Sequence, residues 1–93
     1  MKSQTFASVW DALEDTKEAA ANMRVRAELM IAVRHFVEKG RLTQTEAAKR
    51  LGITQPRLND LLRGRIEKFS VDALVNMLTR SGRHVAIRVG KAA

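Results

Sequence analysis

The side chains best suited to specific chemistry in this 93-residue chain lie in its middle third. Gln55, Arg57 and Asn59 occupy alternate positions in the stretch QPRLNDLL. Glutamine, asparagine and arginine each present paired hydrogen-bonding groups in a fixed plane. Such pairs match the donors and acceptors on base edges in the DNA major groove. The pattern favours reading by hydrogen bonds over bond-breaking chemistry.

Groups suited to catalysis or metal binding are few. The chain has no cysteine and two histidines, His35 and His84, without a carboxylate cluster at ligand spacing. Two such ligands do not make a closed zinc site. No nucleophile–base arrangement or phosphate-binding glycine loop is present. We therefore expect no enzyme activity, no metal site and no cofactor.

The charge is strongly basic and unevenly distributed. The chain carries 17 Lys and Arg against 10 Asp and Glu, a net charge of +7. Residues 1–22 have a balance of −2, whereas the remaining 71 residues have a balance of +9. Such an excess attracts polyanions, of which nucleic acid is the commonest. A surface charged only for solubility is the alternative, and charge alone does not exclude it.

Two short helices with a tight turn between them are predicted around the polar residues. Thr43 and Glu46 form a capping-box pattern at the start of the first helix, and Thr54 is the expected cap of the second. Gly52 lies between the helices and permits a tight turn. The expected inward-facing residues are Ala47, Ala48, Leu51, Leu58, Leu61 and Leu62. This is a helix-turn-helix pattern whose second helix leaves its polar face exposed.

Helical periodicity also covers the flanks. A short helix is predicted over residues 9–15 after a Ser8 cap, a longer one from about residue 16 or 22 to residue 39, and a last one over 71–80 after a Ser70 cap. The long helix has two apolar stripes, which indicates two packing partners. The stripes are Val25, Leu29, Ala32, Val33 and Phe36, and then Met23, Ala27, Met30 and Val37, the second interrupted by Arg34.

The last residues change to a period of two. Val85, Ile87 and Val89 alternate with His84, Ala86 and Arg88, a pattern that predicts a single β-strand. A lone strand must place its backbone donors and acceptors on water or another chain. We expect antiparallel pairing with a second copy, with Val85, Ile87 and Val89 at the dimer interface. Pairing with residues 4–7 of the same chain, or a dimer through the second stripe of the long helix, are the alternatives.

The stretch LTQTEAAKRLGITQPRLNDLLRG resembles the lambda-repressor-like (Cro/C1-type, XRE family) helix-turn-helix regulators, and the resemblance extends over residues 22–78. It implies that Gln44 grips a DNA phosphate and that Gln55 contacts a base. It also implies that Arg63 and Arg65 hold backbone phosphates. Asp60 faces outward and either accepts a hydrogen bond from a cytosine amino group or repels phosphate.

The flanking stretches SVWDALED and FSVDALVNMLTRSGRHVAIRV are similar to those of a branch of small bacterial regulators, many of them HigA-like antitoxins. The resemblance implies a second partner, a toxin that cleaves mRNA and that the antitoxin neutralises. This implication rests on family likeness and not on spacing or charge.

Together these features predict an all-α, five-helix lambda-repressor-like domain with a short N-terminal helix and a C-terminal β-strand used for dimerisation. The expected units are an N-terminal extension (1–21), a helix-turn-helix domain (22–80) and a strand with tail (81–93). The expected function is sequence-specific binding of double-stranded DNA by a cytoplasmic, homodimeric repressor without a membrane segment. The alternatives are an antitoxin that mainly neutralises a toxin and a non-specific architectural nucleic-acid protein.

Overall fold

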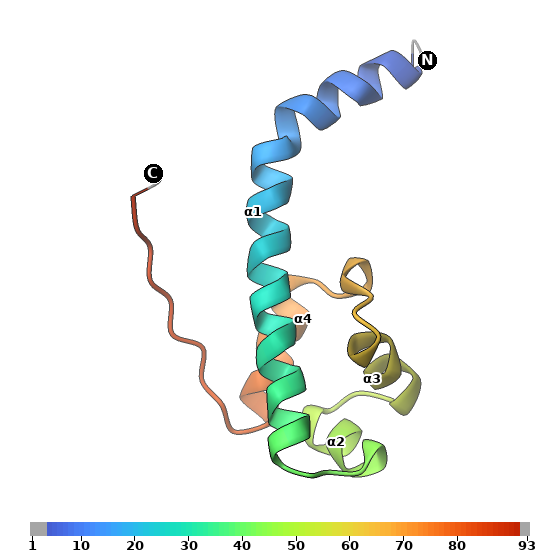
Figure 1. Cartoon of the computed structure of the whole chain (residues 1–93), viewed down its shortest axis with the longest axis vertical. Helices are drawn as coiled ribbons and strands as arrows, with labels where there is room; N and C mark the ends of the chain where they lie inside the picture. Colours follow the sequence, from blue (N-terminus) through green and yellow to red (C-terminus); the bar gives the residue numbers. More distant parts are fainter. Residues whose placement is uncertain (1–3, 92–93) are drawn as a thin grey trace.

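The computed structural model describes residues 4–91, and every regular element in that range is helical. The order is α1 (Gln4–Lys39), α2 (Gln44–Leu51), α3 (Gln55–Leu62), the 3-10 turn η1 (Ile66–Lys68) and α4 (Val71–Arg80). Figure 1 shows α2, α3 and α4 gathered around the C-terminal half of α1, while the N-terminal part of α1 bends away from them. Within residues 4–91, no helix combines the length and the apolar composition that crossing a membrane requires.

The core lies where α1 meets the three shorter helices. From α1 it takes Met30, Val33, Phe36 and Val37, all at most 9% exposed. These four come from both predicted stripes, because the short helices cover one broad face of α1. Neither stripe is buried along its whole length. The N-terminal members Met23 and Val25 stay 41% and 47% exposed.

The predicted caps of the three short helices are confirmed. Thr43 and Glu46 exchange two hydrogen bonds, Glu46 N to Thr43 Oγ1 at 3.1 Å and Thr43 N to Glu46 Oε1 at 3.0 Å. The backbone hydrogen bond from Thr43 holds the pKa of Glu46 below its usual value. Thr54 accepts from the backbone of Arg57, and Ser70 accepts from the backbone of Ala73. Each cap satisfies a backbone donor that the helix itself leaves free.

The prediction of five helices is wrong. The part of the chain that the structure describes contains four α-helices, because α1 runs without a break from Gln4 to Lys39 where two helices were expected. No glycine or proline interrupts this stretch, so nothing in the backbone ends the first helix. The side chains of residues 1–15, including the expected Ser8 cap, lie outside the described residues.

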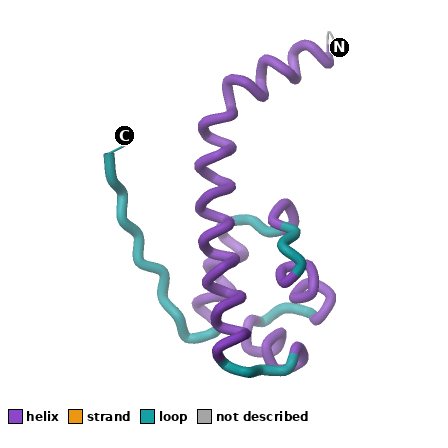
Figure 2. Tube along the Cα trace, viewed as in Figure 1, coloured by secondary structure: helices purple, strands orange, loops and turns teal. Residues whose placement is uncertain are grey.

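The predicted C-terminal β-strand is also wrong. Residues 83–91 form no strand and follow an extended path that leads away from the helices (Figure 2). Alternation alone does not make a strand without a ladder partner, and residues 4–7, the intramolecular candidate, belong to α1. Val85 packs partly against the core, whereas Ile87 and Val89 are 82% and 90% exposed. These residues therefore form no strand-paired interface in this chain.

Left-handed backbone ends several of the helices. Gly52 has φ +74° and Gly64 has φ +76°. After α1 the left-handed residue is Arg41, with φ +52°, and not the neighbouring Gly40. The surroundings of the two glycines differ. A Cβ atom on Gly52 would lie 2.5 Å from Cδ of Arg80, whereas one on Gly64 would meet nothing within 4 Å.

We expect Gly52→Ala to destabilise the fold more than Gly64→Ala. Both alanines must adopt positive φ, which costs about 1–2 kcal/mol. Gly52→Ala must in addition displace the Arg80 side chain, so its loss of unfolding free energy should be the larger. Urea denaturation of both variants measures the difference. Equal losses would mean that Arg80 moves aside without cost.

Candidate nucleic-acid interface

The α2–turn–α3 unit has the helix-turn-helix arrangement that the sequence predicts. Three residues, 52–54, separate the helices, and Ile53 N donates to the carbonyl of Ala48 at 2.9 Å. Leu51, Leu58 and Leu61 are at most 2% exposed. Because the leucines of α3 point into the core, its opposite face is turned to solvent. Gln55 is exposed on that side, whereas Asn59 is half-buried.

A hydrogen bond joins the first turns of α2 and α3. Nε2 of Gln55 donates to Oγ1 of Thr45 at 2.7 Å, and both residues are exposed. The bond restrains the Gln55 amide and leaves its carbonyl oxygen free to accept. Sequence reasoning missed Thr45, because a separation of ten residues across a turn gives no local periodic signal. Gln44, the residue before Thr45, is exposed at the first position of α2.

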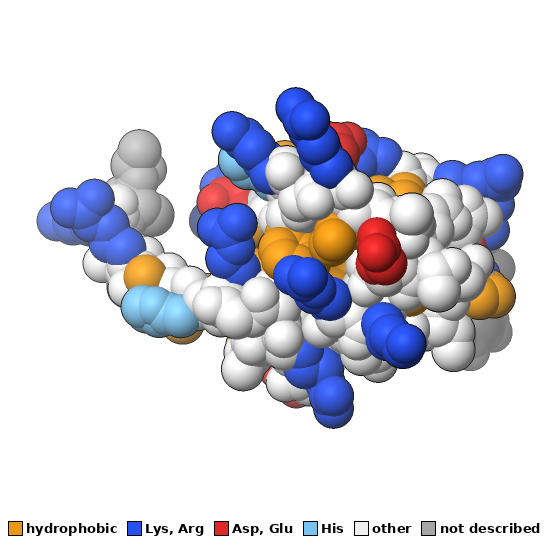
Figure 3. Space-filling view, turned by 90° about the horizontal axis from the view of Figure 1, so that it is seen from below, with side chains coloured by type: hydrophobic (Ala, Val, Ile, Leu, Met, Phe, Trp, Pro, Cys, Tyr) orange, Lys and Arg blue, Asp and Glu red, His pale blue; other side chains and the backbone are white. Residues whose placement is uncertain are grey.

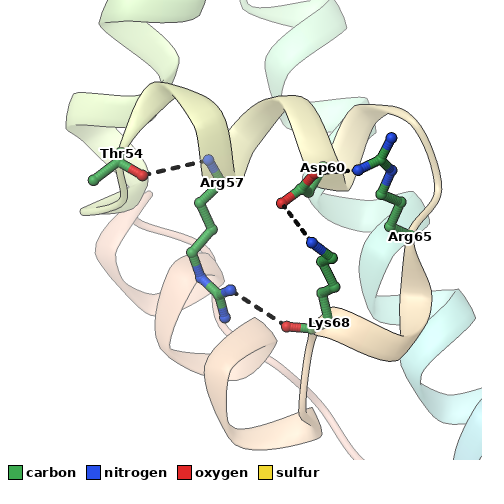
Figure 4. A network of polar contacts seen from close by, with 5 residues as sticks. All are labelled: Thr54, Arg57, Asp60, Arg65 and Lys68. Atoms are coloured by element: carbon green, nitrogen blue, oxygen red, sulfur yellow. Dashed lines mark hydrogen bonds and ion pairs between the residues drawn. The ribbon is translucent and has the colours of Figure 1, made fainter.

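The Arg57 side chain contacts the residues at the end of η1. Its Nη1 donates to the carbonyl of Lys68 at 3.3 Å, and its guanidinium carbon lies 4.5 Å from the centroid of the Phe69 ring. Figure 4 shows the side chain reaching from α3 towards η1. A cation over an aromatic face is attracted by the ring quadrupole. In this state Arg57 connects α3 to Lys68, the last residue of η1, and to Phe69, which follows it.

Asp60 is held by two cations from the segment after α3. Its Oδ1 lies 3.1 Å from Nη1 of Arg65, and its Oδ2 lies 3.7 Å from Nζ of Lys68 (Figure 4). Arg63, by contrast, is exposed and has no side-chain partner among residues 16–91, the part of the chain whose side chains the structure describes. The two arginines with the same predicted role thus differ: Arg65 already pairs with a carboxylate, and Arg63 does not.

Two arginines of α1 donate hydrogen bonds to the backbone between the end of α3 and η1. Arg34 Nη2 donates to the carbonyl of Leu62, and Arg26 Nη1 donates to the carbonyl of Ile66 at 3.3 Å. Sequence reasoning took Arg34 only as an interruption of an apolar stripe. That interruption was the available signal, because an arginine in an apolar stripe must satisfy its donors on neighbouring backbone or water.

Basic side chains are spread over the end of the molecule that carries α2 (Figure 3). They outnumber the acidic ones in this view, as the charge balance of the sequence leads us to expect. The exposed basic residues between the end of α1 and η1 are Lys39, Arg41, Lys49, Arg50, Arg63, Arg65 and Lys68. In the described part of the chain, no group of three or more His, Asp or Glu could hold a metal ion.

Comparisons with known proteins agree with this geometry. A family model described as "Helix-turn-helix domain" matches residues 12–90. A solved structure described as "Putative XRE Family Transcriptional Regulator" is 32% identical, with a TM-score of 0.72. The match covers 80% of this chain and 83% of that one. No curated protein matches the sequence. The chain belongs to the helix-turn-helix family, as a DNA-binding protein of the XRE type of transcriptional regulator.

Proposed function

We propose that this protein represses transcription by binding one duplex sequence through α3. The observation that carries the proposal is the orientation of α3, whose apolar side is buried through Leu58 and Leu61. Its polar side is therefore free to enter a major groove, which is wide enough to admit a helix. The proposed binding unit is residues 22–80, and α1 continues beyond its N-terminal boundary.

Base reading is assigned first to Gln55 and Asn59. The Thr45 hydroxyl holds the Gln55 amide at the start of α3, the end of a recognition helix that meets base edges. Asn59 lies one helical turn further along the same face. Arg57 is a third reader only after its side chain leaves the Phe69 ring, so it contributes on binding and not before.

Phosphate contacts are assigned to Gln44 on one side of α3 and to Arg63 and Arg65 on the other. All three are exposed, and they lie on segments that flank the recognition helix in the chain. Contacts to phosphates set the position of a protein on the duplex without reading its sequence. This division supports a complex in which α3 enters the groove and its flanks rest on the backbone.

We further propose that the repressor acts as a homodimer on a two-fold symmetric site. Ile87 and Val89 are almost fully exposed beyond α4, and covering them with a second copy removes apolar surface from water. Val85, which already packs partly on the core, joins the tail to each protomer. Two recognition helices then lie about 34 Å apart, one turn of duplex.

A second candidate function is that of a HigA-like antitoxin that binds a toxin. One observation favours a protein partner: an apolar cleft of about 240 Å³ between α1 and the segment after α3, beside Ile31, which is 66% exposed. Co-expression with the product of the adjacent gene tests this candidate. Co-purification of the two proteins, abolished by Ile31→Ser, would support it. Separate elution of the two would argue against it.

The first prediction concerns base reading. Gln55→Ala should weaken binding to a duplex selected from a random pool by about 1–3 kcal/mol and change binding to a scrambled duplex much less. Thr45→Val, which removes the restraint but keeps Gln55, is the matched control and should cost less. Fluorescence anisotropy titrations give both constants. Equal losses on the two duplexes would exclude Gln55 as a reader.

The second prediction concerns phosphates. Arg63→Ala and Arg65→Ala should each weaken binding to any duplex and flatten the slope of log K against log salt by about one unit. The reason is that each contact to phosphate releases about one counterion. Arg24→Ala, an exposed arginine in the projecting half of α1, is the control. If the slope is unchanged, the arginine concerned does not contact a DNA phosphate.

The third prediction concerns the dimer. Replacing Ile87 and Val89 together with serine should convert the protein to a monomer, because the tail then has little apolar surface to bury. Multi-angle light scattering measures the mass. Met23→Ser, a change on the exposed stripe of α1, is the comparison. If the tail variant remains dimeric and Met23→Ser is monomeric, the interface lies on α1.

A further inference from the structure

Asp60 is the single acidic residue of α3, and it lies on the side of the helix that faces the segment after it. Its carboxylate is held by Arg65 at 3.1 Å and by Lys68 at 3.7 Å, one cation on each oxygen. The Asp60 side chain is 22% exposed, whereas those of Arg65 and Lys68 are 43% and 49% exposed. The cations thus remain open to solvent while the anion between them is more covered.

Hydrogen bonds hold the backbone that carries Arg65 and Lys68 in place. Arg57 Nη1 donates to the carbonyl of Lys68, and Arg26 Nη1 donates to the carbonyl of Ile66. Arg65 N donates to the carbonyl of Asp60 itself at 3.0 Å. The fold therefore places the backbone of Arg65 and Lys68 close to Asp60, and this position favours the pairing of their side chains.

A DNA phosphate offers these cations the same kind of partner as the carboxylate does: charged oxygens that accept from arginine and lysine. With Asp60 present the three groups carry a net charge of +1, and without its charge they carry +2. Non-specific binding to duplex DNA comes almost entirely from such charges. Asp60 thus lies where it subtracts from that attraction.

We propose that Asp60 is an internal competitor for DNA phosphate: it holds Arg65 and Lys68 in the free protein and thereby limits the affinity for DNA of any sequence. The proposal rests on the proposed function, because it concerns the same DNA-binding surface. It assigns Asp60 the role of a residue that sets sequence-independent affinity, in place of a contact to a base. A protein that must leave random DNA to find one site gains from such a limit.

The test is Asp60→Asn, which keeps the size of the side chain and removes its charge. Binding to a scrambled duplex is titrated at several salt concentrations. One additional net contact should tighten binding about eightfold at 0.1 M salt and steepen the slope of log K against log salt by about one unit. Unchanged affinity and slope would overturn the proposal.

The matched control is Glu28→Gln, which makes the same change in net charge at an exposed position of α1. It should leave the salt slope unchanged. If it tightens binding as much as Asp60→Asn does, the effect belongs to overall charge, and the proposal fails. Asp60→Ser is a second variant with a smaller polar side chain, and circular dichroism checks that both Asp60 variants remain folded.

A variant cycle identifies the route of the effect. In a protein that already carries Arg65→Ala and Lys68→Ala, Asp60→Asn should lose most of its gain. A gain that persists there would mean that Asp60 repels DNA directly, against the proposal. A loss of binding to the selected duplex alone would make Asp60 a base reader, also against it. If the wild-type protein binds the selected and the scrambled duplex equally, the proposed sequence-specific function is wrong. The titrations on scrambled DNA would still test the role of Asp60.

Discussion

Burial of the inner face of α3 is the constraint on which the rest of the structure depends. Leu58 and Leu61 are at most 2% exposed and face a core built from α1, α2 and α4. An eight-residue helix is too short to be stable alone in water, so this packing both forms α3 and fixes its rotation. That rotation decides which side chains of α3 can contact DNA, because the polar face lies opposite the buried leucines.

Arginine serves two purposes in this chain, and the structure separates them. Arg26, Arg34 and Arg57 donate to backbone carbonyls of the segment that runs from the end of α3 to Phe69. Arginine suits this task because its planar fork offers several donors from one side chain. The basic composition that suggests nucleic-acid binding is thus in part structural, and fewer cations are available to DNA than the 17 Lys and Arg residues of the chain indicate.

Local signals could be predicted from the sequence, and contacts across turns could not. The caps at Thr43, Thr54 and Ser70, the turn at Gly52 and the buried leucines of α3 each depend on a few neighbouring residues, and all are present. The Gln55–Thr45 bond, the position of Arg57 on Phe69 and the pairing of Asp60 depend on how segments meet, which periodicity does not encode. The predicted strand is absent for a related reason. Alternation is a property of one segment, whereas a β-ladder needs a second segment to pair with.

The length of α1 has a consequence for how the molecule opens. The helix has 36 residues, about 54 Å measured along its bent axis. Residues 16–25 are exposed throughout, while Met30, Val33, Phe36 and Val37 lie in the core. We expect amides in the core half to exchange their hydrogens only when the domain unfolds, and those in the projecting half to exchange through local fraying. A single continuous helix should therefore show two levels of hydrogen-exchange protection, with the boundary close to the point where α4 and η1 cease to cover it.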